Sequence, residues 1–208
     1  MLAVHASSNA ETANKLVKRR KQSANGSLLT DIGVGLVILA VIAIFSIPYV
    51  NEYLIDAKTP KVAEDLRRFM ARNRINGTAS ADPNTAFSAA TQRAFALALS
   101  GSTTMSSNRN TFVVQHNLGS GGVILYAGAD GGKGYTLTLD KVHQVACASL
   151  AGILNRDSNK ISINGQEQKN TETPVNFSAT TAEAACVDGE NNTMVFTAGN
   201  YEINAGSR

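Results

Sequence analysis

Residues 24–31 read Ala24-Asn25-Gly26-Ser27-Leu28-Leu29-Thr30-Asp31, and an apolar run from Ile32 to Val50 follows them directly. The run contains no charged side chain, and twelve of its nineteen residues are Val, Ile, Leu or Phe. On an insertion scale these residues favour the bilayer by about 4 to 7 kcal/mol, as an upper bound. A helix of this length extends about 28 Å, which is enough to cross a hydrocarbon core. The stretch therefore predicts a helix that inserts into a membrane.

The order of the segments before the apolar run is unlike that of an ordinary secretory signal. In such a signal the cleavage site follows both the basic and the apolar region. Here a basic cluster comes first (Lys15, Lys18, Arg19, Arg20 and Lys21), then the small residue Gly26, and only then the apolar run. Cleavage after Gly26 would remove the basic leader, residues 1–26, and leave the apolar helix on a mature chain that begins at Ser27.

These residues resemble the class III signal of type IV prepilins, and the 26-residue leader resembles that of the type IVb subclass. Gly26 matches the residue before the cut, and Asp31 falls where the family usually has Glu. Pro48 falls where a proline commonly interrupts the pilin helix. The resemblance implies a prepilin peptidase that cuts Gly26–Ser27 and can methylate the new amine. It also implies that Asp31 pairs with the amino terminus of a neighbouring subunit in a filament.

The simpler alternative for this stretch is a single-pass anchor with a basic cytoplasmic flank, as the positive-inside rule predicts. Asp31 favours the assembly interpretation, because an acid beside a membrane helix is costly unless it has a partner. The leader carries a charge of +4 and the whole chain +3, which leaves the mature chain at −1. The basic residues of the leader thus act as a topology signal, and we expect no binding of nucleic acid.

Beyond Pro48 the apolar residues keep a helical spacing. Val62, Leu66, Phe69, Met70 and Asn73 recur at intervals of three and four, as in an amphipathic helix that covers a globular domain. We expect one helical spine from Ile32 to Asn76, about 65 to 70 Å long and bent or broken at Pro48 and Pro60. Gly77 is predicted to end it in a left-handed cap conformation.

The rest of the chain predicts short strands and helices. We expect a connecting region, 77–110, with a short helix that starts at Asp82-Pro83 and an exposed loop from Ser100 to Asn110. Asp130 to Gly134 is predicted as a hairpin turn in preference to a phosphate loop. The expected strands are Thr111–Leu118, Val123–Ala127, Tyr135–Val142 and Thr193–Ala198, and the expected helices are His143–Leu154 and Thr181–Cys186.

The predicted fold is therefore α+β: a long N-terminal helical spine packed on an antiparallel sheet head with one disulfide. We expect a transmembrane or filament-core helix at 27–53 and a globular head at 54–208. The head would comprise an amphipathic helical half at 54–76, the connecting region, and a sheet with a disulfide-bounded region at 111–208.

The two cysteines, Cys147 and Cys186, are the only ones in the chain. Export across the membrane would place them in an oxidising compartment, where a disulfide is expected. Closing a loop of about 40 residues stabilises the fold by roughly 4 kcal/mol. Two unpaired buried thiols are the alternative, and the C-x-x-C spacing of a redox centre is absent. The arrangement resembles the disulfide-bounded C-terminal region of type IVb pilins. Residues 155–180, polar and turn-rich, would there form variable surface and subunit contacts.

The search for catalytic residues finds no nucleophile–base pair and no metal spacing. The two histidines outside the leader, His116 and His143, have no ligand partners nearby in sequence, so polar surface roles are predicted for both. We expect a protein that is not an enzyme and needs no cofactor.

Together these patterns predict the major subunit of a type IVb pilus. Its partners would be other copies of itself, the prepilin peptidase, the inner-membrane assembly machinery and, before assembly, membrane lipid. It would reside in the bacterial inner membrane and then in an extracellular pilus that serves adhesion, aggregation or conjugative transfer. The alternatives are a minor pilin or secretion pseudopilin and, from another class, a membrane-tethered periplasmic binding module.

Overall fold

The computed structural model describes residues 5–89, 91–99, 104–108, 111–173 and 175–200, with 5–31, 46–49, 104–108 and 111 described by their backbone alone. By their contacts the residues form two compact units, Met1–Asn51 and Glu52–Arg208. The second unit, called the head below, contains the sheet.

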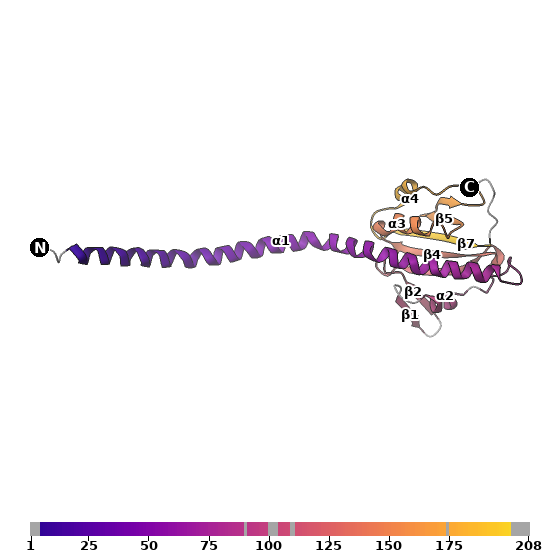
Figure 1. Cartoon of the computed structure of the whole chain (residues 1–208), viewed down its shortest axis with the longest axis horizontal. Helices are drawn as coiled ribbons and strands as arrows, with labels where there is room; N and C mark the ends of the chain where they lie inside the picture. The colour runs from indigo at the N-terminus through magenta and orange to yellow at the C-terminus, as the bar shows by residue number, and fades with distance from the viewer. Residues whose placement is uncertain (1–4, 90, 100–103, 109–110, 174, 201–208) are drawn as a thin grey trace. The chain divides into compact units, whose positions relative to one another are not determined.

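The first element, α1, runs from His5 to Thr78 (Figure 1). It contains the predicted spine and begins 27 residues before Ile32. No proline lies between His5 and Ile47, so nothing in that stretch removes a helical hydrogen bond. The helix continues through Pro48 and Pro60, where an interruption was predicted. At Thr59 the side-chain hydroxyl donates to the carbonyl of Ile55 at 2.9 Å, one residue before Pro60.

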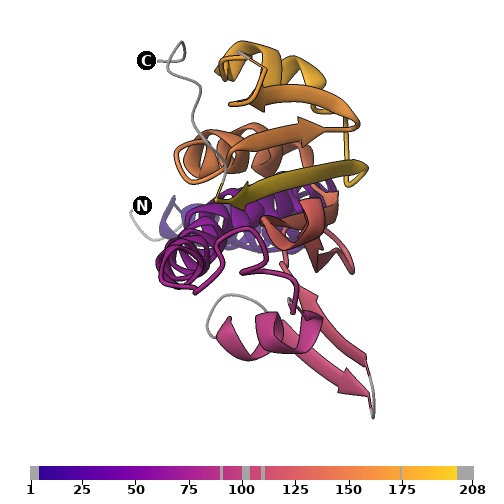
Figure 2. The ribbon, with the colours of Figure 1, turned by 90° about the vertical axis from the view of Figure 1, so that its right-hand side faces the viewer.

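The described residues form a seven-stranded sheet in which every pairing is antiparallel and the strand order is β1-β2-β3-β4-β7-β5-β6. Figures 1 and 2 place α2 with β1 and β2 at one end of this sheet and α3 with α4 at the other. The strands are β1 (Thr104–Asn108), β2 (Thr111–Gln115), β3 (Val123–Ala129), β4 (Gly134–Val142), β5 (Lys160–Ile163), β6 (Gln166–Asn170) and β7 (Asn192–Gly199). The short helices are α2 (Gln92–Ala98), α3 (Gln144–Leu154), α4 (Ala179–Ala185) and the 3-10 turn η1 (Asp130–Gly132).

The strand register lines up two rows of apolar side chains on one face of the sheet. Successive side chains alternate between faces, so residues paired across strands share a face. The first row is Tyr126, Leu137, Phe196 and Ile161, and the second is Ile124, Leu139, Met194 and Ile163. All of them are buried except Tyr126, which is half-buried. The α+β fold and the antiparallel sheet predicted from the sequence are thus confirmed.

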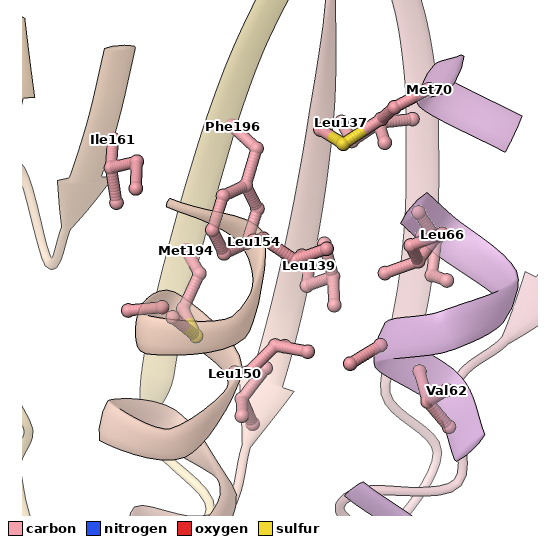
Figure 3. Close-up of a cluster of buried hydrophobic side chains, with 14 of the residues drawn as sticks. Val62, Leu66, Met70, Leu137, Leu139, Leu150, Leu154, Ile161, Met194 and Phe196 are labelled. Atoms are coloured by element: carbon pink, nitrogen blue, oxygen red, sulfur yellow. The ribbon is translucent and has the colours of Figure 1, made fainter. Parts of the chain in front are cut away.

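One stripe of α1 covers these rows (Figure 3). Val62, Leu66 and Met70 are 2% exposed or less, and they lie opposite Leu137 and Leu139 of β4. Two buried leucines of α3, Leu150 and Leu154, cover the β7 side of the same face. The predicted helical spacing of this stripe is therefore correct, because each of its turns returns an apolar side chain to the sheet.

An aromatic cluster closes the core beside this stripe. The ring of Phe69 in α1 makes edge-on contacts with Phe95 of α2, Tyr126 of β3 and Tyr135 of β4, at centroid distances of 4.9 to 5.9 Å. Phe87, from the segment between α1 and α2, packs on Tyr135 at 5.0 Å. Edge-on pairs of this kind are favourable beyond the area that they bury, so the cluster fixes α1, α2 and the sheet against one another.

Gly77 is required for a reason other than the predicted cap. It lies inside α1, one residue before the helix ends, and its φ is not in the left-handed region. A Cβ at this position would lie 2.5 Å from the Phe87 ring, closer than side chains allow. The left-handed cap prediction is wrong, and the position needs glycine because the aromatic cluster approaches the backbone there.

The region between α1 and the sheet differs from the sequence prediction. Residues 82–89 form turns, and the short helix starts at Gln92 with Thr91 as its N-cap. Gln92 explains the shift, because its side-chain amide donates to the Ile124 carbonyl at 2.8 Å and accepts from the Tyr126 amide at 2.7 Å. It thereby binds the edge of β3 from Ile124, which is paired with Val114 of β2, to Tyr126, which lies beyond the residue pairs that join β3 to β2.

Three strands arise from segments predicted to be irregular. The expected loop from Ser100 to Asn110 contains β1, and residues 155–180 contain the β5–β6 hairpin. β6 is polar and has no apolar alternation that would predict a strand. It forms a strand because it pairs with β5. The predicted hairpin turn at Asp130 to Gly134 is confirmed, with Gly131 and Gly132 at positive φ between β3 and β4.

His116 is a core residue, contrary to the predicted surface role. It has no exposed surface, its Nδ1 accepts from the Leu118 amide at 3.0 Å, and its Nε2 lies 2.7 Å from the Asp140 carbonyl. Since Nδ1 accepts, the ring is neutral and its proton is on Nε2. Burial lowers the pKa of His116 below its ordinary value of 6.5.

This geometry predicts a head that loses stability in mild acid. The unfolded chain takes up the His116 proton near pH 6.5, whereas the folded chain resists it, so stability is present above pH 6.5 and falls as the pH drops towards the folded pKa. The slope reaches at most about 1.4 kcal/mol per pH unit for one proton. Urea unfolding followed by tyrosine fluorescence between pH 7.5 and 5 measures it. His116→Gln should be less stable at pH 7.5 but lack this contribution to the slope, and an unchanged slope would contradict the prediction.

Candidate assembly segment and disulfide-closed region

The apolar segment Ile32–Phe45 of α1 exposes its large side chains in every direction. Its Val, Ile, Leu and Phe residues retain between 47% and 69% of their surface. Four of them, from Leu36 to Leu39, are consecutive and so span a full turn of helix. A helix that is apolar all round is stable only when lipid or other protein surrounds it.

The second half of α1 has the opposite character. From Thr59 onward one stripe is buried and the exposed side is mostly polar, with Arg68 paired to Glu64 there. Arg67 also joins this half of α1 to the segment after α3, since its Nε donates to a carboxylate oxygen of Asp157 at 2.8 Å. The part of α1 inside the head therefore buries one stripe within the chain, whereas Ile32–Phe45 exposes large apolar side chains all round.

Four predicted site residues lie within α1. The backbones of Gly26, Ser27, Asp31 and Pro48 are helical, and their side chains are outside the described residues. The cleavage at Gly26–Ser27 and the pairing of Asp31 with an amino terminus stay predictions.

By length and composition, no single helix among the described residues qualifies as a membrane span. Two consecutive segments of α1, Ile32–Phe45 and Val50–Thr78, qualify only as a pair, and residues 46–49, which include Pro48, separate them.

The disulfide between Cys147 and Cys186 is present, as predicted. It joins the first turn of α3 to the residue that caps the end of α4, across 39 positions of sequence. The β5–β6 hairpin and α4 lie inside the closed loop. The bond thus fixes the outer part of the sheet to α3, which belongs to the core.

Asn192 fixes the same region with hydrogen bonds. It is fully buried at the start of β7, and its Nδ2 donates to the carbonyls of Val142 and Val187 at 3.0 and 2.9 Å. Its Oδ1 accepts from the Val187 amide and from Asn164 at 2.7 and 3.0 Å. All four hydrogen bonds that this side chain can make are formed. Its partner Val187 comes one residue after Cys186, and its partner Val142 is the last residue of β4.

His143 begins α3 as its N-cap, and its Nδ1 accepts from the Val145 amide at 3.3 Å. The predicted helix start is confirmed within one residue. Among the described residues, no three His, Cys, Asp or Glu side chains gather as a metal site would require.

Residues 90–199 match the family model described as PilS N terminal. That range covers 110 of the 208 residues, and it includes the sheet, α2 to α4 and the disulfide. The chain belongs to the PilS N-terminal family. No curated protein matches the chain in sequence.

Membership of the PilS N-terminal family identifies a pilus-related protein and a pilus assembly context. The matched residues lie in the head, so the match is independent of the apolar segment and of the leader from which a pilin was predicted.

Sequence reasoning missed the structural roles of Asn192 and His116. Alternation gave a signal for His116, because Val114, His116 and Leu118 fall on one face of the predicted strand, and all three are buried. Asn192 had no such signal, since its four partners lie as far as 50 positions away.

Replacing Asn192 by Ala should destabilise the head by about 2 to 4 kcal/mol, because four buried or part-buried hydrogen bonds are lost together. Asn191→Ala is the matched control, since the neighbouring side chain is exposed and donates only to the Asp188 carbonyl. Urea unfolding of both variants measures the difference. Equal stabilities for the two would contradict the role of Asn192.

Replacing either cysteine by Ser should lower stability by about 4 kcal/mol, since the closed loop gains conformational freedom in the unfolded chain. The measurement is urea unfolding of the variant beside the oxidised parent. A reduced and alkylated parent should unfold at the same urea concentration as the variants, and full stability after reduction would show that the bond is not needed.

Proposed function

We propose that the chain is the major structural subunit of a type IVb pilus, and that its role is assembly rather than catalysis. The observation that carries the proposal is the all-round apolar, exposed surface of Ile32–Phe45 on a chain of the PilS N-terminal family. A pilus-related chain with such a segment needs surroundings that cover every side of a helix, and a bundle of identical helices supplies them.

Maturation starts at the leader. A prepilin peptidase cuts Gly26–Ser27, removes the basic residues, and leaves the α-amine of Ser27 as the new terminus. Before cleavage the leader carries +4, which holds this end on the cytoplasmic side of the inner membrane. After cleavage the α-amine is the one positive group that remains near Asp31 in the sequence.

The subunit then moves from lipid into a filament. In both places the apolar residues of 32–45 are out of water, so the exchange keeps their hydrophobic stabilisation. Asp31 makes the exchange directional, because an unpaired carboxylate among apolar helices costs several kcal/mol. Contact between Asp31 of one subunit and the amine of Ser27 of the next removes that cost and sets the axial register.

Identical heads joined head-to-tail give an open helical fibre when the rotation between them does not close a ring. Pro48 supports such packing, since it lacks an amide donor and lets the helix open locally beside its neighbours. The disulfide-closed region would then form the outer surface and the contacts between subunits. Adhesion, aggregation and conjugative transfer are all compatible with this arrangement.

Two alternatives make different predictions about location. A minor pilin or secretion pseudopilin would use the same peptidase but be scarce in filaments. A membrane-tethered periplasmic binding module would stay in the membrane. Mechanical shearing of cells separates the three, because only a major pilin is the abundant protein of the sheared filament fraction.

Mass spectrometry of that fraction should find Ser27 at the amino terminus. A filament-borne chain that keeps residues 1–26 would rule out the proposed maturation.

The pairing of Asp31 is tested by two substitutions. Asp31→Ala should leave cleavage intact but reduce filaments at least tenfold, because the variant has no carboxylate to compensate the Ser27 amine of the neighbouring subunit. Asp31→Glu should assemble, since it keeps the charge. Asp56→Ala is the matched control on an exposed acid of the same helix, and it should assemble like the parent. Near-normal filaments from Asp31→Ala would limit Asp31 to a favourable helix-dipole interaction of about 0.3 to 1 kcal/mol.

A further inference from the structure

The head contains a basic cleft of about 340 Å³ near the C-terminal end of α1. Its three cations come from separate parts of the chain: Arg74 from α1, Arg156 from the segment after α3, and Lys169 from β6. The remaining lining residues are polar or small: Thr78, Ser158, Asn159, Thr171, Gly199 and Asn200. Among the described residues, none of those that line the cleft is acidic.

The cations of this cleft have no carboxylate partner within the described part of the chain. The ion pairs found there join Arg67 to Asp157, Arg68 to Glu64 and Lys160 to Glu172. Asp157 has its carboxylate paired with Arg67, and Arg74 reaches only the Asp157 backbone carbonyl at 3.4 Å. The Asp157 carboxylate interacts with Lys169 electrostatically, but among the described residues no carboxylate forms an ion pair with the three cations.

Lys169 is held rigidly in this position. Its Nζ donates to the carbonyls of Asn155 and Ser158 at 2.6 and 2.8 Å, which leaves one N–H for a further acceptor. Burial and the nearby charge of Arg74 lower the pKa of Lys169. A negative ligand would remove the repulsion between the two cations.

We propose that this cleft is a binding site for a phosphate or sulfate group, held by Arg74, Arg156 and Lys169. Three cations favour such a group over a carboxylate, because one carboxylate would leave most of the charge uncompensated. Guanidinium forks also match the oxygens of phosphate and sulfate. The group can be a free ion or part of an anionic saccharide, and the proposal does not depend on filament formation.

The test is calorimetric titration of the full chain in a neutral detergent with inorganic phosphate, against sodium chloride of equal ionic strength. We expect saturable binding of one phosphate per chain. Arg74→Gln and Arg156→Gln should each weaken it about tenfold, the usual effect of losing one charge-assisted hydrogen bond. Arg72→Gln is the matched control, an exposed arginine of the same helix that lies outside the cleft, and it should bind like the parent.

A heparin-derived tetrasaccharide, titrated in parallel, identifies the source of the group. Binding at least tenfold tighter than phosphate through the same residues indicates a saccharide, and equal binding indicates the free ion.

Three results would overturn the proposal. The first is no saturable phosphate binding at matched ionic strength. The second is an equal loss of binding in Arg72→Gln and Arg74→Gln, which would indicate unspecific attraction. The third is self-association of the chain that Arg74→Gln abolishes while phosphate does not bind, which would assign the cleft to an acidic side chain of a second copy.

Discussion

The packing of one stripe of α1 on two rows of sheet residues is the interaction on which the head depends. Val62, Leu66 and Met70 supply the helix side, and the register of β3, β4, β7 and β5 supplies the sheet side. A shift of one residue in any of these strands would turn its apolar side chains to the opposite face. The same register positions β5 and β6, and with them the disulfide-closed loop and the basic cleft.

The two halves of α1 differ in which of their side chains are buried. The half inside the head is one-sided and finds its partner within the chain, whereas Ile32–Phe45 presents apolar side chains all round. A single helix thus joins a folded domain to a segment that requires other molecules. This division agrees with a pilus-related family and with the proposed exchange between lipid and filament, in which the head keeps its structure.

The disulfide-closed region is held by constraints of different kinds. Cys147–Cys186 limits the unfolded chain, the buried Asn192 side chain makes four hydrogen bonds, and the β5–β6 hairpin extends the sheet. Because these constraints meet at α3 and β7, the outer surface of the loop can carry polar side chains without loss of order. The cleft of Arg74, Arg156 and Lys169 lies at the border between this region and α1.

Sequence alone determined the features that depend on neighbours in the chain. The apolar run, the helical spacing from Val62 to Met70, the alternation in β4 and the two cysteines all indicate their structures locally, and together they gave the α+β fold. Tertiary structure decided the rest. β1 and β6 exist because a partner strand is beside them, and Gly77 is needed because Phe87 approaches it. His116, Asn192 and the three cations of the cleft obtain their roles from groups far away in sequence, and spacing along the chain carries no record of such contacts.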